Sequence, residues 1–133
     1  MAGITSVLCT GLIERFPNLR FAFLESGSNW IAPYVEPLDD HFNNSRYNAQ
    51  QLIDRSPSDY LNSGRIFIGC EGDEPSLARM VGEIRENKLI YSSDYPHADS
   101  SEGTVRFLQE RNDLSASATR GMLEENARRF YGF

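Results

Sequence analysis

The sequence predicts an α/β fold in which three parallel strands alternate with helices. Three short apolar runs have the length of buried strands, and they cover residues 19–24, 65–69 and 88–91. Their side chains leave little room for a solvent-facing side, as is typical of parallel strands that helices cover on both faces. Segments with helical periodicity separate the runs, so we expect right-handed crossovers between the strands.

The predicted order is helix, strand, helix, strand, helix, strand and then two helices. The first helix ends at Pro17, and the second begins at Trp30. Residues 43–55 are polar and fit either a continued helix or a loop, and residues 56–61 fit a short capped turn. The apolar positions on one side are Leu8, Leu12 and Phe16 in the first helix and Ile31, Tyr34 or Val35, Leu38 and Phe42 in the second.

The third helix and the last two have recognisable starting signals. Asp73-Glu74-Pro75 is expected to open the third helix with an acidic cap and a proline in its first turn. A further helix is expected over residues 103–110, and Ser115 can cap the last one. The predicted inward-facing residues are Leu77, Met80, Val81 and Ile84 in the third helix and Leu123, Ala127 and Phe130 in the last.

Composition narrows the possible functions. With 133 residues and 40% hydrophobic content, the chain is sized for one domain with an apolar core. A net charge of -6 argues against nucleic-acid or anionic-membrane partners, and no apolar run approaches the roughly 18 residues of a membrane helix. Cys9 and Cys70 form neither a disulfide framework nor a metal-binding pair, so we expect a cytoplasmic location.

The three predicted strands all end in acidic or titratable residues. The first runs into Glu25-Ser26-Gly27, the second into Cys70-Glu71-Gly72-Asp73 and the third into Ser92-Ser93-Asp94-Tyr95-Pro96-His97. Parallel α/β folds place their active sites at the carboxyl ends of strands. We therefore expect the carboxylates of Glu25, Glu71 and Asp94 to converge on a shared cavity at one end of the sheet.

Each of the main candidates also has a structural interpretation. Asp94 can be a turn or capping residue, and His97 can simply follow a proline in an exposed loop. The Glu25 carboxylate can be a base or a ligand, or it can anchor neighbouring backbone amides. Glu71 and Asp73 also fit roles in a loop and a helix cap.

Two further residues are candidates for packing and support. Trp30 can cover a substrate pocket or belong to the core. The Asn126 side chain is expected to bind loop backbone.

Four segments of the sequence form a recognisable set. The segments are Glu14-Arg15-Phe16-Pro17-Asn18-Leu19-Arg20-Phe21, Leu24-Glu25-Ser26-Gly27 with Trp30, Ser92-Ser93-Asp94-Tyr95-Pro96-His97, and Glu125-Asn126-Ala127-Arg128-Arg129-Phe130-Tyr131. Together they resemble the carboxyl-terminal half of the amidohydrolase-2 family, whose members are metal-dependent TIM-barrel hydrolases and decarboxylases related to aminocarboxymuconate semialdehyde decarboxylase. The resemblance implies that the three strands correspond to strands six to eight of a (β/α)8 barrel.

The resemblance also implies roles for individual residues. Asp94 matches the aspartate that ends the last strand, where it lies at the metal and handles a proton. Glu25 stands where many family members have an acid/base histidine, and it is the second catalytic candidate. His97, Trp30 and Glu71 are the substrate-binding candidates. A divalent metal is implied, with zinc the expected ion, weakly bound or absent in this chain alone. The family's His-x-His pair and its fifth-strand histidine would precede Met1.

The function expected from this resemblance is a metal-dependent hydrolase or decarboxylase that acts on a small carboxylated ring or its cleavage product. This chain would be a fragment of it, without the His-x-His motif. One alternative is a non-catalytic half-barrel that pairs with itself or with another chain. Another is a magnesium-dependent phosphoryl-transfer domain using Glu25, Asp73 and Asp94, although there is no glycine-rich phosphate loop. Because three strands cannot close a barrel, we expect a homo-oligomer or an amino-terminal partner.

Overall fold

A three-stranded parallel sheet forms the centre of the molecule in the computed structural model, which describes residues 2–44, 52–97 and 104–133. The strands are β1 (Phe21–Phe23), β2 (Ile66–Cys70) and β3 (Leu89–Tyr91), arranged in the order β1-β2-β3. β2 pairs in parallel with both neighbours. The predicted α/β alternation with parallel strands is therefore confirmed, and the first and third strands are its edges, as expected.

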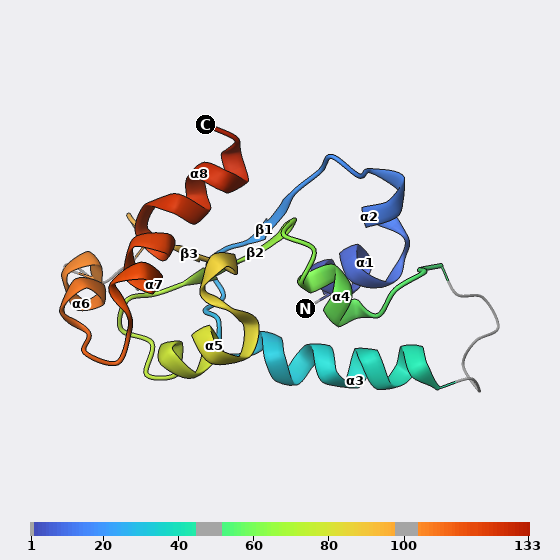
Figure 1. Ribbon diagram of the computed structural model, residues 1–133, viewed down its shortest axis with the longest axis horizontal. Helices are drawn as coiled ribbons and strands as arrows, with labels where there is room; N and C mark the ends of the chain where they lie inside the picture. The colour runs from blue at the N-terminus through green and yellow to red at the C-terminus, as the bar shows by residue number, and fades with distance from the viewer. Residues whose placement is uncertain (1, 45–51, 98–103) are drawn as a thin grey trace.

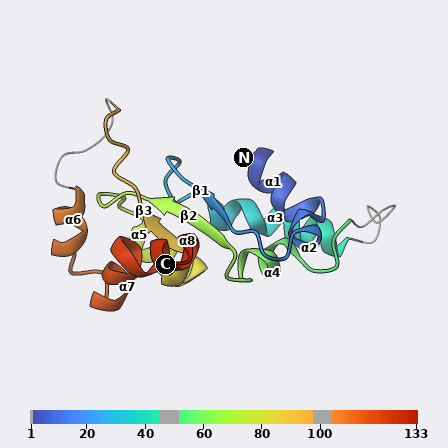
Figure 2. The ribbon, with the colours of Figure 1, turned by 90° about the horizontal axis from the view of Figure 1, so that it is seen from above.

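Helices connect the strands and extend beyond them. Figures 1 and 2 both show α1, α2 and α4 at one end of the long axis and α6 and α7 at the other. The helical elements are α1 (Ala2–Cys9), α2 (Leu12–Arg15), α3 (Ile31–Asn43), α4 (Pro57–Leu61), α5 (Leu77–Ile84), the 3-10 turn η2 (Glu86–Lys88), α6 (Thr104–Glu110), α7 (Ala116–Arg120), the π-helical turn η3 (Gly121–Glu125) and α8 (Asn126–Tyr131).

The strands differ slightly in extent from the sequence prediction. The paired part of β1 is shorter than residues 19–24, because Leu19 and Leu24 lie beyond the ladder and are 49% and 42% exposed. β2 includes Cys70, which is aligned with Tyr91 of β3. Lys88 belongs to η2 rather than to the last strand.

Two helix predictions need correction. The opening helix is interrupted at Gly11, whose φ of 72° is left-handed and whose α-carbon faces the Leu52 carbonyl so closely that a Cβ would lie 2.5 Å from its oxygen. The third helix begins at Leu77 rather than at Asp73-Glu74-Pro75. The Glu74 carboxylate binds other segments, as described below, and does not cap this helix.

The apolar core lies on one face of the sheet. Alternate residues of β2 (Ile66, Ile68 and Cys70) are buried there against α1, α3, α4 and α5. On the opposite face, Phe67 packs edge-to-face against Phe130 of α8, with ring centroids 5.5 Å apart. Figure 1 shows α8 on the other side of the strands from α3 and α5. Helices thus cover both faces, as the apolar strands predict.

The carboxyl-terminal helices support the outer edge of β3. Ser115 caps α7 as predicted, its hydroxyl accepting a hydrogen bond from the Ala118 amide at 3.0 Å. The buried Asn126 side chain donates to the carbonyl oxygens of Glu86 and Leu89, both at 2.7 Å, which confirms its expected backbone-binding role. The Asn126 Oδ1 atom has no hydrogen-bond partner within the described part of the chain.

Some predictions fall on residues outside the described ranges. Most of the ambiguous segment 43–55 lies there, and so does the predicted helix start at Gly103. Among the helices of residues 2–44, 52–97 and 104–133, none is both long and apolar enough to cross a membrane.

Candidate active site at the carboxyl ends of the strands

Glu25 lies just beyond the end of β1, against the middle strand. A Cβ added at Gly69 of β2 would be 2.9 Å from the Leu24 α-carbon and 3.3 Å from the Glu25 nitrogen. Only glycine lets the two backbones approach so closely. Glu25 has a left-handed backbone with φ of 57°, and its side chain is exposed. Gly69 therefore helps to determine where the Glu25 carboxylate projects.

Asp94 and His97 form a short turn after β3. The Ser92 amide donates to the Cys70 carbonyl at 3.0 Å, which keeps the chain beside β2 for one more residue. The His97 amide then donates to the Asp94 carbonyl at 2.9 Å. The ring Nδ1 of His97 is 2.8 Å from Asp94 Oδ1, so the carboxylate orients the imidazole.

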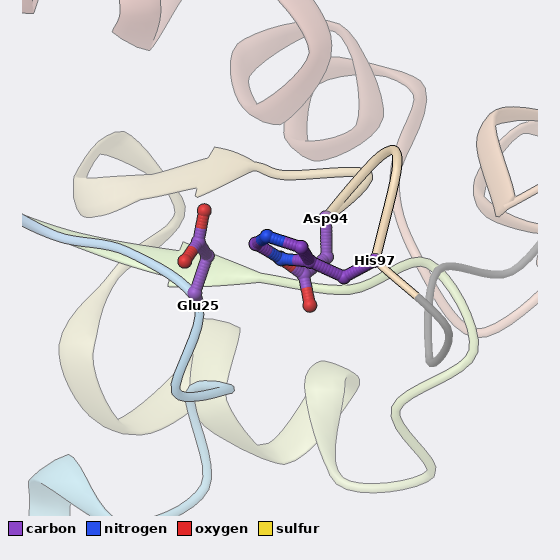
Figure 3. Close-up of side chains that lie close together, drawn as sticks. All are labelled: Glu25, Asp94 and His97. Carbon is purple, nitrogen blue, oxygen red and sulfur yellow. The ribbon is translucent and has the colours of Figure 1, made fainter.

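The three side chains meet at one place. One ligand atom from each of Glu25, Asp94 and His97 lies within 4.8 Å of the other two. Figure 3 shows the carboxylate of Glu25 arriving from the loop after β1, while Asp94 and the His97 ring arrive from the loop after β3. The predicted convergence of Glu25 and Asp94 is confirmed, and His97 joins them. We call these three residues the strand-end cluster.

Backbone conformation sets two members of the strand-end cluster apart. Asp94 has φ of 53°. Both carboxylate residues of the strand-end cluster, Glu25 and Asp94, therefore have a left-handed backbone. Such a conformation costs a non-glycine residue on the order of 1 kcal/mol, and residues of this kind collect at functional sites. Arg85 is the other non-glycine residue with positive φ in the described part of the chain.

Glu71 does not join the strand-end cluster, contrary to the expectation of three converging carboxylates. It follows β2 and is half-buried, and its backbone amide donates to Glu74 Oε1 at 2.8 Å. Asp73 is exposed and also lies outside the cluster. The middle strand therefore ends in a loop whose carboxylates are not members of the cluster.

Glu74 joins two loops instead of capping a helix, contrary to the prediction from the sequence. Its Oε2 accepts hydrogen bonds from the Ser28 hydroxyl at 2.6 Å and from the Ser28 amide at 3.0 Å. Together with the bond from the Glu71 amide, these contacts tie the loop after β1 to the loop after β2. No local signal could reveal this, because Ser28 lies 46 residues earlier in the chain.

Arg111 holds the backbone of the same loop. Its Nη1 donates to the Glu74 carbonyl at 2.6 Å and to the Gly72 carbonyl at 3.3 Å, and the guanidinium binds Asp113 through two nitrogens. The hydrogen bond from Arg111 lowers the pKa of Asp113. Burial raises the pKa of the Cys70 thiol, and the negative charges of Glu74 and Glu71 raise it further.

Trp30 lies beside a cavity rather than in the strand-end cluster. Its indole Nε1 donates to the Gly27 carbonyl at 2.9 Å, and its ring contacts Tyr34 edge-to-face. The half-buried ring lines a cavity of about 650 Å³. The other lining residues come from α1, from the end of β1 and from the loop after it, and they are Gly3, Ile4, Ala22, Phe23, Leu24, Ser26 and Asn29.

The donor atoms of the strand-end cluster fit a divalent metal ion. Two ligands of one ion, each about 2.1 Å from it, are separated by at most about 4.2 Å. The separation of up to 4.8 Å is close to this limit, so modest side-chain movement would bring the three donors together. Carboxylate oxygens suit manganese and magnesium, whereas an imidazole nitrogen suits zinc and other transition metals.

Comparison with known proteins identifies the family of the chain. The sequence profile described as Amidohydrolase matches residues 1–133. The chain belongs to the amidohydrolase family. Its three parallel strands and their helices match part of the barrel structures of other amidohydrolases, as the resemblance implied. The assignment to strands six to eight stays a prediction.

The relatives of this amidohydrolase chain include decarboxylases. It is 24% identical over 131 residues to a 2-amino-3-carboxymuconate-6-semialdehyde decarboxylase of Dictyostelium discoideum, covering 97% of this chain and 35% of that one. It also resembles the crystal structure of an amidohydrolase from Mycobacterium avium subsp. paratuberculosis K-10, with a TM-score of 0.82 and 23% identity over 98% of this chain and 32% of the other.

A third similar structure contains a metal. It is a 5-carboxyvanillate decarboxylase from Novosphingobium aromaticivorans with bound manganese and 3-methoxy-4-hydroxy-5-nitrobenzoic acid. The TM-score is 0.77 with 17% identity, over 98% of this chain and 38% of that protein. The present amidohydrolase chain thus spans between about a third and two fifths of the length of these relatives.

Proposed function

We propose that this chain supplies part of the active site of a metal-dependent decarboxylase that acts on a small carboxylated ring compound or its cleavage product. The observation that carries the proposal is the meeting of Glu25, Asp94 and His97 at the carboxyl ends of two parallel strands. Two of the similar proteins are named as decarboxylases, which favours decarboxylation over hydrolysis. A role in hydrolysis would use the same three side chains.

Asp94 would be the main ligand of the divalent metal, and Glu25 and His97 would lie beside the ion. A metal bound there would supply Lewis-acid polarisation of a substrate oxygen. The manganese in a similar structure supports a first test with Mn²⁺, and zinc remains the ion expected from the wider resemblance. We expect weak binding to this chain alone, since a tight zinc site needs about three well-placed protein ligands and two of these three side chains are exposed.

The side chains of the strand-end cluster would also take part in proton transfer. Decarboxylation breaks the bond between a ring carbon and its carboxylate, and a proton must replace the departing carbon dioxide. Glu25 is exposed beside the His97 ring and would serve as the acid that delivers this proton. Asp94 would fix the orientation of the imidazole through its 2.8 Å contact with Nδ1. His97 would then contact the substrate.

Trp30 and Glu71 would lie farther from the reaction. The Trp30 ring borders the cavity next to the end of β1, so it would contribute an apolar wall to the substrate entrance. Glu71 would act through its loop, because it lies outside the cluster. Both remain substrate-binding proposals.

The complete site would need further residues. In the family that the sequence resembles, a His-x-His pair and another histidine complete the metal site. The exposed edge of β1 would join the corresponding part of the barrel, or a second copy of this chain. We therefore propose that the active form is an assembly rather than an isolated chain.

The test is turnover by an assembly that contains this chain. Release of carbon dioxide from small aromatic carboxylates would be measured with added Mn²⁺ or Zn²⁺. Asp94→Asn keeps the side-chain shape but removes a basic oxygen, so turnover should fall by at least about 10²-fold. Asp73→Asn, on an exposed residue outside the cluster, is the matched control. Near-normal turnover in Asp94→Asn would rule out the assigned role, and a chain with neither metal binding nor turnover would favour the non-catalytic alternative.

A further inference from the structure

The loop that carries Glu25 is anchored from the middle strand. Glu25 itself is exposed and left-handed, so its own side chain gives the loop little support. Three residues later, Ser28 is completely buried, and its amide and hydroxyl both donate to the Glu74 carboxylate. This is the point at which the Glu25 loop is held.

The contact is built for an anion. The Glu74 carboxylate accepts hydrogen bonds from three donors. They are the Ser28 hydroxyl at 2.6 Å, the Glu71 amide at 2.8 Å and the Ser28 amide at 3.0 Å. Hydrogen bonds to an ionised carboxylate are about twice as strong as those between neutral groups. A carboxylate that joins two loops in this way limits the movement of both.

The surroundings of Ser28 leave little space for rearrangement. A Cβ added at Gly27, which has φ of 62°, would lie 3.6 Å from Glu74 Oε1, so the carboxylate packs directly against this turn. On the other side of the turn, the Trp30 indole donates to the Gly27 carbonyl. The backbone of Glu74 is itself held by Arg111, whose side chain is 15% exposed.

We propose that Glu74 is a positioning residue that keeps Glu25 beside Asp94 and His97 by anchoring Ser28 to the end of β2. The proposal deepens the proposed function, on which it rests for its chemical meaning. Glu74 lies outside the strand-end cluster and acts through the loop. Without it, Glu25 would sample positions away from the His97 ring.

The variants separate the anchor from simple loss of charge. Glu74→Ala removes the carboxylate that accepts from Ser28 and from the Glu71 amide. Glu74→Gln keeps an oxygen for the Glu71 amide and, at 3.2 Å, for the Ser28 amide. Its new amide group can donate to the Ser28 hydroxyl but no longer accepts from the Ser28 amide, so this variant should retain part of the anchor. Asp73→Ala, at the exposed neighbouring residue, removes the same charge without touching Ser28 and is the matched control.

The experiment follows the His97 ring by nuclear magnetic resonance in the metal-free full chain. The chain has two histidines, His41 and His97, so assignment needs one further variant, His41→Gln. Glu25→Gln should shift the His97 resonance because it changes a neighbouring charge. Glu74→Ala should produce a comparable shift, and adding Glu25→Gln to Glu74→Ala should then have no further effect. Glu74→Gln and Asp73→Ala should leave the Glu25-dependent shift in place.

The outcomes distinguish the anchor from the proposed function. A Glu25-dependent shift that survives in Glu74→Ala, or is lost equally in Asp73→Ala, would overturn the positioning role. If Glu74→Ala does not fold, Ser28→Ala removes the 2.6 Å bond to Glu74 and should weaken the effect of Glu25 on the His97 resonance.

Added Mn²⁺ tests the proposed function separately. It should broaden the His97 resonance in the wild type, and the Mn²⁺ affinity should be reduced about tenfold in Glu74→Ala. Absence of broadening in the wild type would reject the metal site and leave the metal-free result standing.

Discussion

The loops after the two edge strands differ from the loop after the middle strand, although all three begin with acidic residues near the strand end. Glu25 and Asp94, after β1 and β3, have left-handed backbones and turn their carboxylates toward His97. Glu71 and Glu74, after β2, lie in a loop where the Glu74 carboxylate accepts from the Ser28 and Glu71 amides and the Glu74 carbonyl accepts from Arg111. The edge-strand loops present charged groups, whereas the middle loop holds the loop after β1 in place.

This difference shows that residue type and strand-end position do not determine the role of a carboxylate. The edge-strand carboxylates reach a common space because their backbone turns sharply. The middle-strand carboxylate Glu74 is satisfied by three donors and has little capacity left for a ligand. Substitutions in the two kinds of loop should therefore have different consequences.

The largest contrast is expected in metal affinity. Asp94→Ala removes a proposed ligand and the partner of the His97 ring, so Mn²⁺ affinity should fall by at least about tenfold. Glu71→Ala, on the middle loop and outside the cluster, should change affinity much less. Isothermal titration of both variants measures the difference. Equal losses would mean that the two carboxylates act together and that the contrast between the loops is wrong.

The next effect concerns the approach of the strands. Gly69→Ala places a methyl group 2.9 Å from the Leu24 α-carbon, so the end of β1 must move. We expect a loss of about 1–3 kcal/mol in the free energy of unfolding, together with weaker Mn²⁺ binding through Glu25. Gly82→Ala in α5 is the matched control, since nothing lies within 4 Å of its added Cβ. That control should be neutral or stabilising, and similar urea midpoints for both variants would contradict the close approach.

A smaller effect is expected from relief of backbone strain. Glu25→Gly removes the side chain from a left-handed position, so the free energy of unfolding should rise by up to about 1 kcal/mol while Mn²⁺ binding weakens. Arg85→Gly, at φ of 70°, serves as a control for the stability gain without loss of a cluster residue. Chemical denaturation measures both. A stability loss in Glu25→Gly with a gain in Arg85→Gly would show that Glu25 stabilises the fold.

The smallest effect is expected from the pair that supports the middle loop. Arg111 lowers the pKa of Asp113, so the pair stabilises the fold above the ordinary carboxylate pKa of about 4, and this contribution is lost as the pH falls through the lower pKa of the folded state. Asp113→Asn should be slightly less stable than the wild type near neutral pH, and this difference in stability should close as the pH falls through the lowered pKa of Asp113. A gap in urea midpoint that is independent of pH would contradict this contribution.

The elements with regular apolar patterns could be predicted from the sequence. The strands around Ile68 and Ile90, the helix from Ile31 and the cap at Ser115 all depend on neighbouring residues, and all are observed close to their predicted positions. The start of α5 could not be predicted, because Glu74 has two competing uses. Locally it resembles a helix cap, but in the fold its carboxylate binds Ser28 from a distant segment.

The strand-end cluster could be predicted only in part. Parallel strands bring their carboxyl ends together, so the meeting of Glu25 and Asp94 follows from topology. The exclusion of Glu71 does not, because it depends on the left-handed turns at the other two strand ends and on the hydrogen bonds of the middle loop. Gly69 could be read only as a strand residue, since its contact with Leu24 is visible only in three dimensions.

The most direct test of the strand-end cluster is to locate Mn²⁺ by anomalous diffraction in crystals of this chain. We expect an anomalous peak within coordination distance of the Asp94 carboxylate, with the Glu25 carboxylate and the His97 ring as its neighbours. The peak should disappear from crystals of Asp94→Asn grown and soaked in the same way. Manganese bound elsewhere on the chain, with no peak among these three side chains, would contradict the central claim.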